Sequence, residues 1–118
     1  MTAICSNPKR AEISMINSRI HRINHKIDFI VGDLSHIKNK HADIVFLNPQ
    51  NTFTGYIPSK KLKQQPNSTF SLFKHFKPDL LSAVTQSFKI SQRIALKLPW
   101  YTDLNEVAEL FYLALTEL

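Results

Sequence analysis

The run of five residues at 43–47, DIVFL, is the feature that most restricts the fold of this sequence. It is apolar after its first residue, which is typical of a strand buried on both faces of a parallel sheet. Shorter or more mixed runs of the same kind stand at 2–5 (TAIC), 26–31 (KIDFIV) and 93–98 (RIALKL). Each ends in turn residues. These four runs are the predicted strands.

Helices are predicted between the strands. Asn7 is a good helix cap and Pro8 stands where a missing N–H does no harm, so a first helix begins there. Apolar residues then recur at helical spacing to about His21. They are Ala11, Met15, Ile16 and Ile20, with Ile13 and Ile23 nearby. A second helix opens at Pro78-Asp79 and runs to about Phe88.

A third helix begins after the cap residue Asp103, and one of its faces is apolar. That face consists of Val107, Leu110, Phe111 and Ala114. The elements therefore follow the order β-α-β-β-(loop)-α-β-α, which predicts an α/β domain with a mostly parallel sheet. Ligands of such sheets bind outside the carboxyl ends of the strands. The loop at 51–76 is long enough to suggest a function.

Length and charge narrow the possible functions. A chain of 118 residues makes at most one domain, and no apolar run is long enough to cross a bilayer. The single Cys5 excludes an internal disulfide and fits a reducing compartment. Residues 1–97 carry 15 basic and 5 acidic side chains. This excess fits a phosphate-rich partner, but it equally fits a merely basic, soluble surface.

Five segments stand in the order and spacing of one enzyme family. They are AICSNPKRAEISMINSRI, KIDFIVGDL, ADIVFLNPQNTFTGY, KPDLLSAV and IALKLPWYTDLNEVAEL. Together they resemble the trimethylguanosine synthase family, which uses S-adenosylmethionine to methylate the N2 amine of the 7-methylguanosine cap on small nuclear and nucleolar RNAs. The resemblance runs from Ala3 to about Leu110. Its most specific part is the segment Leu-Pro-x-x-x-Asp at 98–103, because several other pieces are generic to class I methyltransferases.

The resemblance implies a Rossmann-like class I methyltransferase sheet with flanking helices. Residues 1–118 would be a partial domain that lacks the first, central strand and the C-terminal strands. Only Gly32 and Gly55 are present, so no Gly-rich cofactor loop exists in this chain. Such a sheet would pair its flanking strands directly or take a strand from a second chain, because open interior edges invite association.

The resemblance also assigns the candidate site residues. Asn48 and Pro49 would hold the guanine amine, and Asp33, with the adjacent Leu34, would bind the cofactor through its adenine. Asn17 stands at a position that contacts the guanine. RNA would further meet Trp100 and the basic cluster of Lys60, Lys61 and Lys63. Nothing implies a metal, since His21 and His25 have the spacing of a ligand pair but no third ligand.

Several family residues are replaced at functional points. Cys5 stands where the family has a ribose-binding aspartate, and Gln50 and Asn51 replace a Pro-Trp pair whose ring would stack on the methylated guanine. Trp100 replaces an arginine that would meet cap phosphates. We therefore expect a weak or inactive enzyme. The alternatives are a non-catalytic RNA-binding or assembly module with the same fold, and a degenerate copy with no stable product.

Each assignment has a structural alternative. Asp33 would serve equally as a turn residue bonded to nearby backbone, and Asn48-Pro49 as a plain turn. Asn17 would be a solvated helix residue, the lysine cluster a solvated loop, and Trp100 a packing residue. The resemblance and the basic charge imply a nuclear protein, and otherwise a cytoplasmic one.

Overall fold

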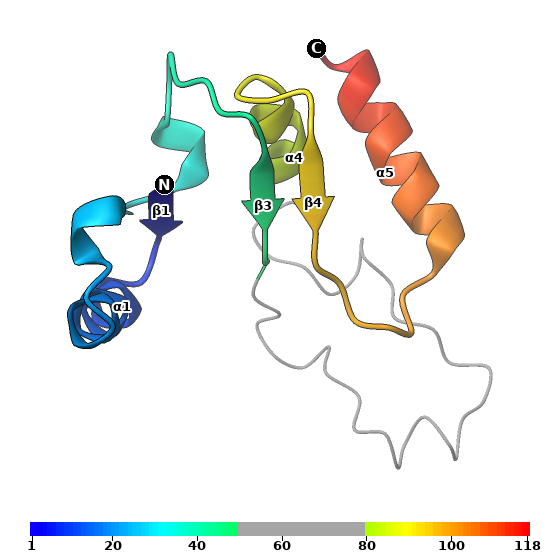
Figure 1. The fold of residues 1–118 in the computed structure, drawn as a ribbon. Helices are drawn as coiled ribbons and strands as arrows, with labels where there is room; N and C mark the ends of the chain where they lie inside the picture. Colours follow the sequence, from blue (N-terminus) through cyan, green and yellow to red (C-terminus); the bar gives the residue numbers. More distant parts are fainter. Residues whose placement is uncertain (50–79) are drawn as a thin grey trace, which may run out of the picture. The chain divides into compact units, whose positions relative to one another are not determined.

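The computed structural model describes residues 1–49 and 80–118, and the predicted loop at 51–76 lies outside these ranges. The described residues form a mixed α/β protein with three α-helices and small parallel sheets (Figure 1). The predicted order of strands and helices is confirmed. The chain divides into two compact units, Met1–Lys38 and Asn39–Leu118, each with one two-stranded sheet.

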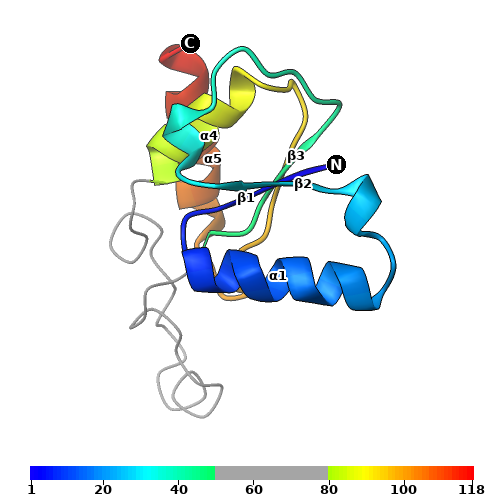
Figure 2. The ribbon, with the colours of Figure 1, turned by 90° about the vertical axis from the view of Figure 1, so that its left-hand side faces the viewer.

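The first unit is a β-α-β unit. Strands β1 (Thr2–Cys5) and β2 (Asp28–Val31) pair in parallel from Thr2 opposite Asp28 to Cys5 opposite Val31. Helix α1 (Pro8–Ile20) connects them and packs along both (Figure 2). Two single-turn 3-10 helices, η1 (Asn24–Lys26) and η2 (Leu34–His36), stand before and after β2.

Capping defines the start of α1 as predicted. The Asn7 side-chain oxygen accepts hydrogen bonds from the backbone N–H groups of Lys9 at 3.0 Å and Arg10 at 3.3 Å. These donors have no partner within the helix, so the cap satisfies them. The helix ends at Ile20, and Arg22 adopts a left-handed backbone with φ of 56°.

The buried face of α1 differs from the apolar pattern that predicted the helix. Ala11 and Ser18 are buried and Met15 is half-buried, whereas Ile16 and Ile20 are 46% and 69% exposed. The buried residues are spaced by three and four positions and share one side of the helix. The buried Ser18 hydroxyl donates to the Met15 carbonyl at 2.6 Å, so its polar group is satisfied.

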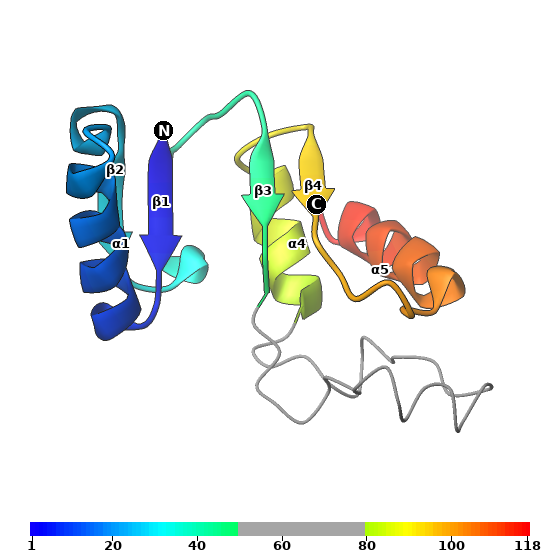
Figure 3. The same ribbon diagram turned by 60° about the horizontal axis from the view of Figure 1, so that its bottom comes forward.

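The second unit packs two helices on a parallel strand pair. Strands β3 (Val45–Leu47) and β4 (Ile94–Leu96) run in the same direction, with Leu47 opposite Leu96 (Figure 3). Helices α4 (Leu80–Phe88) and α5 (Leu104–Thr116) contact each other extensively. The Asp103 side chain caps α5 by accepting from the Asn105 N–H at 2.9 Å, as the sequence predicts.

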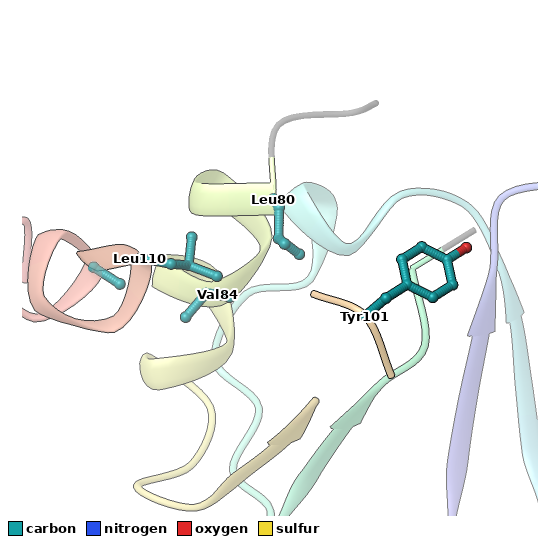
Figure 4. Close-up of a cluster of buried hydrophobic side chains, with 5 residues drawn as sticks. Leu80, Val84, Tyr101 and Leu110 are labelled. Atoms are coloured by element: carbon teal, nitrogen blue, oxygen red, sulfur yellow. The ribbon is translucent and has the colours of Figure 1, made fainter. Parts of the chain in front are cut away.

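The core of this unit lies where α4 meets α5. Val84, Leu110 and Ala114 are fully buried, and Leu80 and Tyr101 are nearly so (Figure 4). Partly buried side chains from both strands and both helices pack around this cluster. They are Leu47, Leu81, Phe88, Ile94, Leu96, Leu98, Val107 and Phe111. The predicted apolar face of α5 is therefore confirmed as its buried face.

A buried serine fixes the start of the β3–β4 pair. The Ser91 hydroxyl donates to the Asp43 carbonyl at 3.0 Å and accepts from the Arg93 N–H at 3.0 Å. The Ala42 N–H donates to the Ile90 carbonyl at 3.1 Å. These bonds join the turn before β4 to the segment that enters β3, and so they support the register of the pair.

The sequence predicts a strand at 43–47 that is buried on both faces, and this prediction is wrong. Regular pairing covers only Val45–Leu47, and Phe46 and Ile44 are 64% and 57% exposed. The physical reason is that α4 and α5 pack on the side where Leu47 lies, while no described residue buries Phe46. Within the described ranges, no helix is long and apolar enough to span a membrane.

Truncation of Leu110 to alanine should lower the free energy of unfolding by about 2–5 kcal/mol, because it leaves a cavity at a fully buried site. Urea denaturation followed by circular dichroism measures the loss. The matched control is Leu115→Ala on the same helix, where the side chain is 56% exposed and a change within about 0.5 kcal/mol is expected. Equal effects of the two variants would show that the α4–α5 core does not hold the chain together.

Candidate functional site

The carboxyl edge of each strand pair carries predicted site residues. In the first unit, Cys5 is opposite Val31, and the Gly32 N–H donates to the Cys5 carbonyl at 2.9 Å. Asp33 follows immediately. Because parallel strands end at the same edge, the backbone brings Cys5 and Asp33 to one end of the β1–β2 sheet.

Asp33 is an exposed carboxylate with a defined orientation. It caps η2, and its Oδ1 accepts a hydrogen bond from the Ser35 N–H at 2.9 Å. That bond is the largest cause of a pKa of Asp33 below its usual value; burial opposes it, and the Ser35 hydroxyl and the charge of His36 add to the lowering. The carboxyl group is therefore ionised at neutral pH.

Asp33 therefore does act as a turn residue bonded to nearby backbone, which was the structural alternative to cofactor binding. This role does not exclude ligand binding, because an ionised carboxylate has about four acceptor positions and the Ser35 N–H takes one. Leu34 is half-buried and begins η2 directly beside it. Ser35 and His36 are not among the residues predicted from the sequence. The signal for them is the pattern Asp-x-Ser, which is typical of a local capping turn.

Cys5 cannot accept hydrogen bonds from two ribose hydroxyls as the aspartate of the family would. It is a free, half-buried thiol whose Sγ lies 3.5 Å from the Asn7 carbonyl, as donor to that oxygen. A thiol is a weak hydrogen-bond acceptor and has one atom where a carboxylate has two. The first unit therefore offers a strong acceptor for an adenine amine at Asp33 and none at Cys5 for two ribose hydroxyls.

The second unit brings Asn48, Pro49 and Trp100 to one edge. Leu47 and Leu96 are opposite each other, and the Lys97 N–H donates to the Leu47 carbonyl at 2.9 Å. Asn48 follows β3 as an exposed residue, and Pro49 is half-buried. Trp100 comes after β4. These three predicted residues therefore follow the carboxyl ends of two paired strands.

The neighbouring aromatic residues Trp100 and Tyr101 differ in burial, and this decides which of them packs in the core. Tyr101 is 8% exposed and belongs to the core, whereas Trp100 is 81% exposed. Their rings meet edge to face, with centroids 5.4 Å apart and an interplanar angle of 89°. Tyr101 is thus the packing residue. The face of the Trp100 ring is open to a stacking partner.

Asn17 lies at the other end of the first unit from Asp33. It is exposed in the third turn of α1 and lines an open cavity of about 330 Å³ with Met1 and Phe29. Because α1 runs back from the carboxyl end of β1 toward the start of β2, this cavity lies near the amino ends of the strands. Asn17 and Asp33 are therefore not brought together within this unit.

Five residues singled out from the sequence lie outside the described ranges: Gln50 and Asn51, where family residues are replaced, and the basic cluster of Lys60, Lys61 and Lys63. In the described part of the chain, no group of three or more His, Cys, Asp or Glu side chains is placed to hold a metal ion. His21 and His25 do not share a helix, since α1 ends at Ile20.

The contribution of Asp33 to stability should depend on pH. Its folded pKa lies below the unfolded value of about 3.9, so the stabilisation is fully present above that pH and is lost as the pH falls through the folded value. Carboxyl-detected NMR titration should show the lowered pKa. Asp33→Asn should remove this part of the acid sensitivity of the unfolding midpoint. The control Asp28→Asn changes an exposed carboxyl that caps no helix, so its unfolding midpoint should stay as sensitive to acid as that of the wild type. Equal acid sensitivity in both variants would contradict a stabilising role of the Asp33 carboxylate.

Comparison with known families assigns the chain to a family. The family model described as RNA cap guanine-N2 methyltransferase matches residues 1–116, nearly the whole chain. A search of curated proteins found no significant match. Because the match covers well over half of the chain, this chain belongs to the RNA cap guanine-N2 methyltransferase family, which is the trimethylguanosine synthase family.

Proposed function

We propose that this chain is a methyltransferase-like domain that binds S-adenosylmethionine and a capped RNA and directs methylation to the guanine N2 amine, with weak or no turnover as it stands. The observation that carries the proposal is Asp33, an exposed, ionised and oriented carboxylate at the carboxyl edge of β2. The family implies the use of S-adenosylmethionine in general. The cofactor would supply the methyl group.

The cofactor would be held at one end only. An Asp33 oxygen would accept from the adenine amine, and Leu34 would cover the ring from the start of η2. Cys5 would leave the ribose hydroxyls without the acceptor that the family provides. Hydrogen bonds to charged groups contribute about 1.5–3 kcal/mol each, so the missing ribose contact predicts weak cofactor binding rather than tight binding.

The target amine would be held by Asn48 and Pro49. The Asn48 side-chain oxygen and the Pro49 carbonyl are acceptors at the end of a hydrogen-bonded strand, and together they would orient the two N–H bonds of the amine. Such placement near the reactive geometry accounts for much of the barrier lowering in transfer reactions of this kind. The ordered end of β3, fixed by the Lys97 N–H, supports this role.

The RNA would meet an aromatic ring and basic side chains. Trp100 is 81% exposed at the same edge as Asn48 and would stack on a base. Lys60, Lys61 and Lys63 would contact phosphates. Asn17 would contact RNA separately, beside the apolar cavity that it lines. The partner proposed from the family and the basic charge is a capped small nuclear or nucleolar RNA, in the nucleus.

A second candidate function is a non-catalytic RNA-binding or assembly module. The hydrogen bond from the Cys5 thiol to the Asn7 carbonyl favours it, because it directs the only side chain at the ribose position toward the backbone. The fold proposed for either function is a Rossmann-like sheet with flanking helices. A second chain that supplies a strand to an open sheet edge is part of the same proposal.

Calorimetric titration with S-adenosylmethionine tests the first function. The folded chain should bind it saturably at micromolar levels, and Asp33→Ala should weaken binding about tenfold or more through loss of a charged acceptor. Asp103→Ala is the matched control. It removes a helix cap of the same geometry, with the same 2.9 Å bond, at a site that is not assigned to the cofactor.

Two results would count against the cofactor site. Equal weakening by Asp33→Ala and Asp103→Ala would show that capping, not ligand contact, causes the loss. No binding by a cooperatively folded wild-type chain would favour the non-catalytic module. The product S-adenosylhomocysteine retains the adenine. The wild-type chain, Asp33→Ala and Asp103→Ala should therefore bind it in the same order of affinity.

Salt dependence tests the RNA contacts. Replacement of Lys60, Lys61 and Lys63 by glutamine should lower the slope of log affinity against log salt by about 2 for a single-stranded capped oligonucleotide, since each phosphate contact contributes about 0.7. Fluorescence anisotropy measures it. The control replaces the exposed lysines Lys38, Lys40 and Lys89, which removes the same charge. A slope that changes equally in both would mean that only net charge matters.

A further inference from the structure

No described helix of the second unit covers one face of the β3–β4 pair. Leu47, Ile94 and Leu96 pack against the core that α4 and α5 form, so their side chains lie on the covered face. Because side chains alternate between the two faces of a strand, Phe46 and its cross-strand partner Ala95 lie on the other face. The Phe46 side chain is 64% exposed there, although phenylalanine is among the residues most often buried.

Two cations stand on this uncovered face. The backbone ladder continues one residue beyond β4 at each end: the Arg93 carbonyl accepts from the Val45 N–H at 2.9 Å. At the other end the Lys97 N–H donates to the Leu47 carbonyl, also at 2.9 Å. Arg93, Ala95 and Lys97 are two residues apart and therefore share a face, and both charged side chains are exposed. The described residues of this face include no acid: they are Ile44, Phe46, Arg93, Ala95 and Lys97.

The Phe46 ring stands beside a strand with one cation toward each end. Arg93 and Lys97 are four residues apart, which separates their Cα atoms by about 13 Å. Ala95 lies between them, directly opposite Phe46. The methyl group of alanine rises little above the sheet, so a flat ligand has room beside the ring. An exposed ring on a sheet with cations on both sides is suited to a stacked base and to the phosphates before and after that base.

We propose that Phe46, Arg93 and Lys97 form a platform for single-stranded RNA. A base stacks on the Phe46 ring, and the two cations contact the flanking phosphates. The inference rests on the RNA binding proposed above and extends it from the capped end to the nucleotides that follow, because Asn48 stands only two residues beyond Phe46.

Charge favours RNA over a protein as the occupant of this face. The centres of protein–protein interfaces are depleted of lysine, whereas Lys97 and Arg93 flank the exposed ring. Two cations without an acid on the same face fit a polyanion, because each phosphate contact releases counterions and so adds to the affinity. Stacking on an aromatic ring tolerates any base, so the platform would bind RNA without reading its sequence.

Fluorescence anisotropy with a short, uncapped, dye-labelled oligouridylate tests the platform without cap or cofactor. Phe46→Ala should raise the dissociation constant about tenfold through the loss of one stacked base. Phe46→Leu keeps an apolar side chain but not the ring and should weaken binding as much, whereas Phe46→Trp should bind at least as tightly as the wild type. The matched control is Tyr112→Ala, which removes a 69% exposed ring from α5 and should leave the dissociation constant unchanged. Circular dichroism checks that each variant keeps its fold.

The salt dependence of the same titration tests the two cations. Arg93→Gln/Lys97→Gln should lower the slope of log affinity against log salt by about 1.4, since each phosphate contact contributes about 0.7. Lys40→Gln/Lys89→Gln removes the same charge from two other exposed positions of the second unit and should leave the slope unchanged. Equal slopes of the two double variants would overturn the role of the cations.

The remaining outcomes separate this inference from the proposed function. Wild-type affinity in Phe46→Leu would overturn the platform and leave RNA binding itself intact. A wild-type chain that does not bind the uncapped oligonucleotide would also overturn the platform, whereas the titrations with S-adenosylmethionine and with capped RNA decide the proposed function independently. Self-association of the wild type that Phe46→Ala abolishes, measured by sedimentation velocity, would show that a second copy covers this face instead of RNA.

Discussion

Parallel pairing of short strands is the constraint on which the rest of this structure depends. A parallel pair places both carboxyl ends at one edge, and each pair here is in exact register over its whole length, with Cys5 opposite Val31 and Leu47 opposite Leu96. This register determines which residues follow the two strands of a pair at the same edge. A shift by one residue would exchange the faces of every side chain in the strand.

The two sheets have different means of support. In the first unit, α1 lies over β1 and β2 on small residues, Ala11 and Ser18, and the bonded Ser18 hydroxyl permits burial without an unsatisfied group. In the second unit, large apolar side chains of α4 and α5 form the core, with Phe88 and Phe111 edge to face at 6.0 Å. Burial of large aliphatic groups contributes most of the stability of such a core.

The sequence predicts local features well here and non-local ones poorly. Asn7 and Asp103 were identifiable as caps because the cap depends only on the residue and the next three N–H groups. The buried face of α1 was not, because isoleucines favour burial more than Ser18 does, and only contact with the strands decides which face is covered. Asp33 and Trp100 follow from the family resemblance, whereas the Ser35 bond and the exposure of the Trp100 ring depend on the folded structure. Lys60, Lys61 and Lys63 lie outside the described residues.

The neighbouring residues Trp100 and Tyr101 have a practical consequence. Trp100 is the one tryptophan in the chain, so the tryptophan emission arises from a single, solvent-exposed indole. Its ring rests against Tyr101, which is anchored in the core. Quenching by an added base or a soluble quencher reports on the exposed face of the ring, while a change in the emission on unfolding reports on the contact with Tyr101. One fluorophore therefore distinguishes events at the surface from loss of the fold.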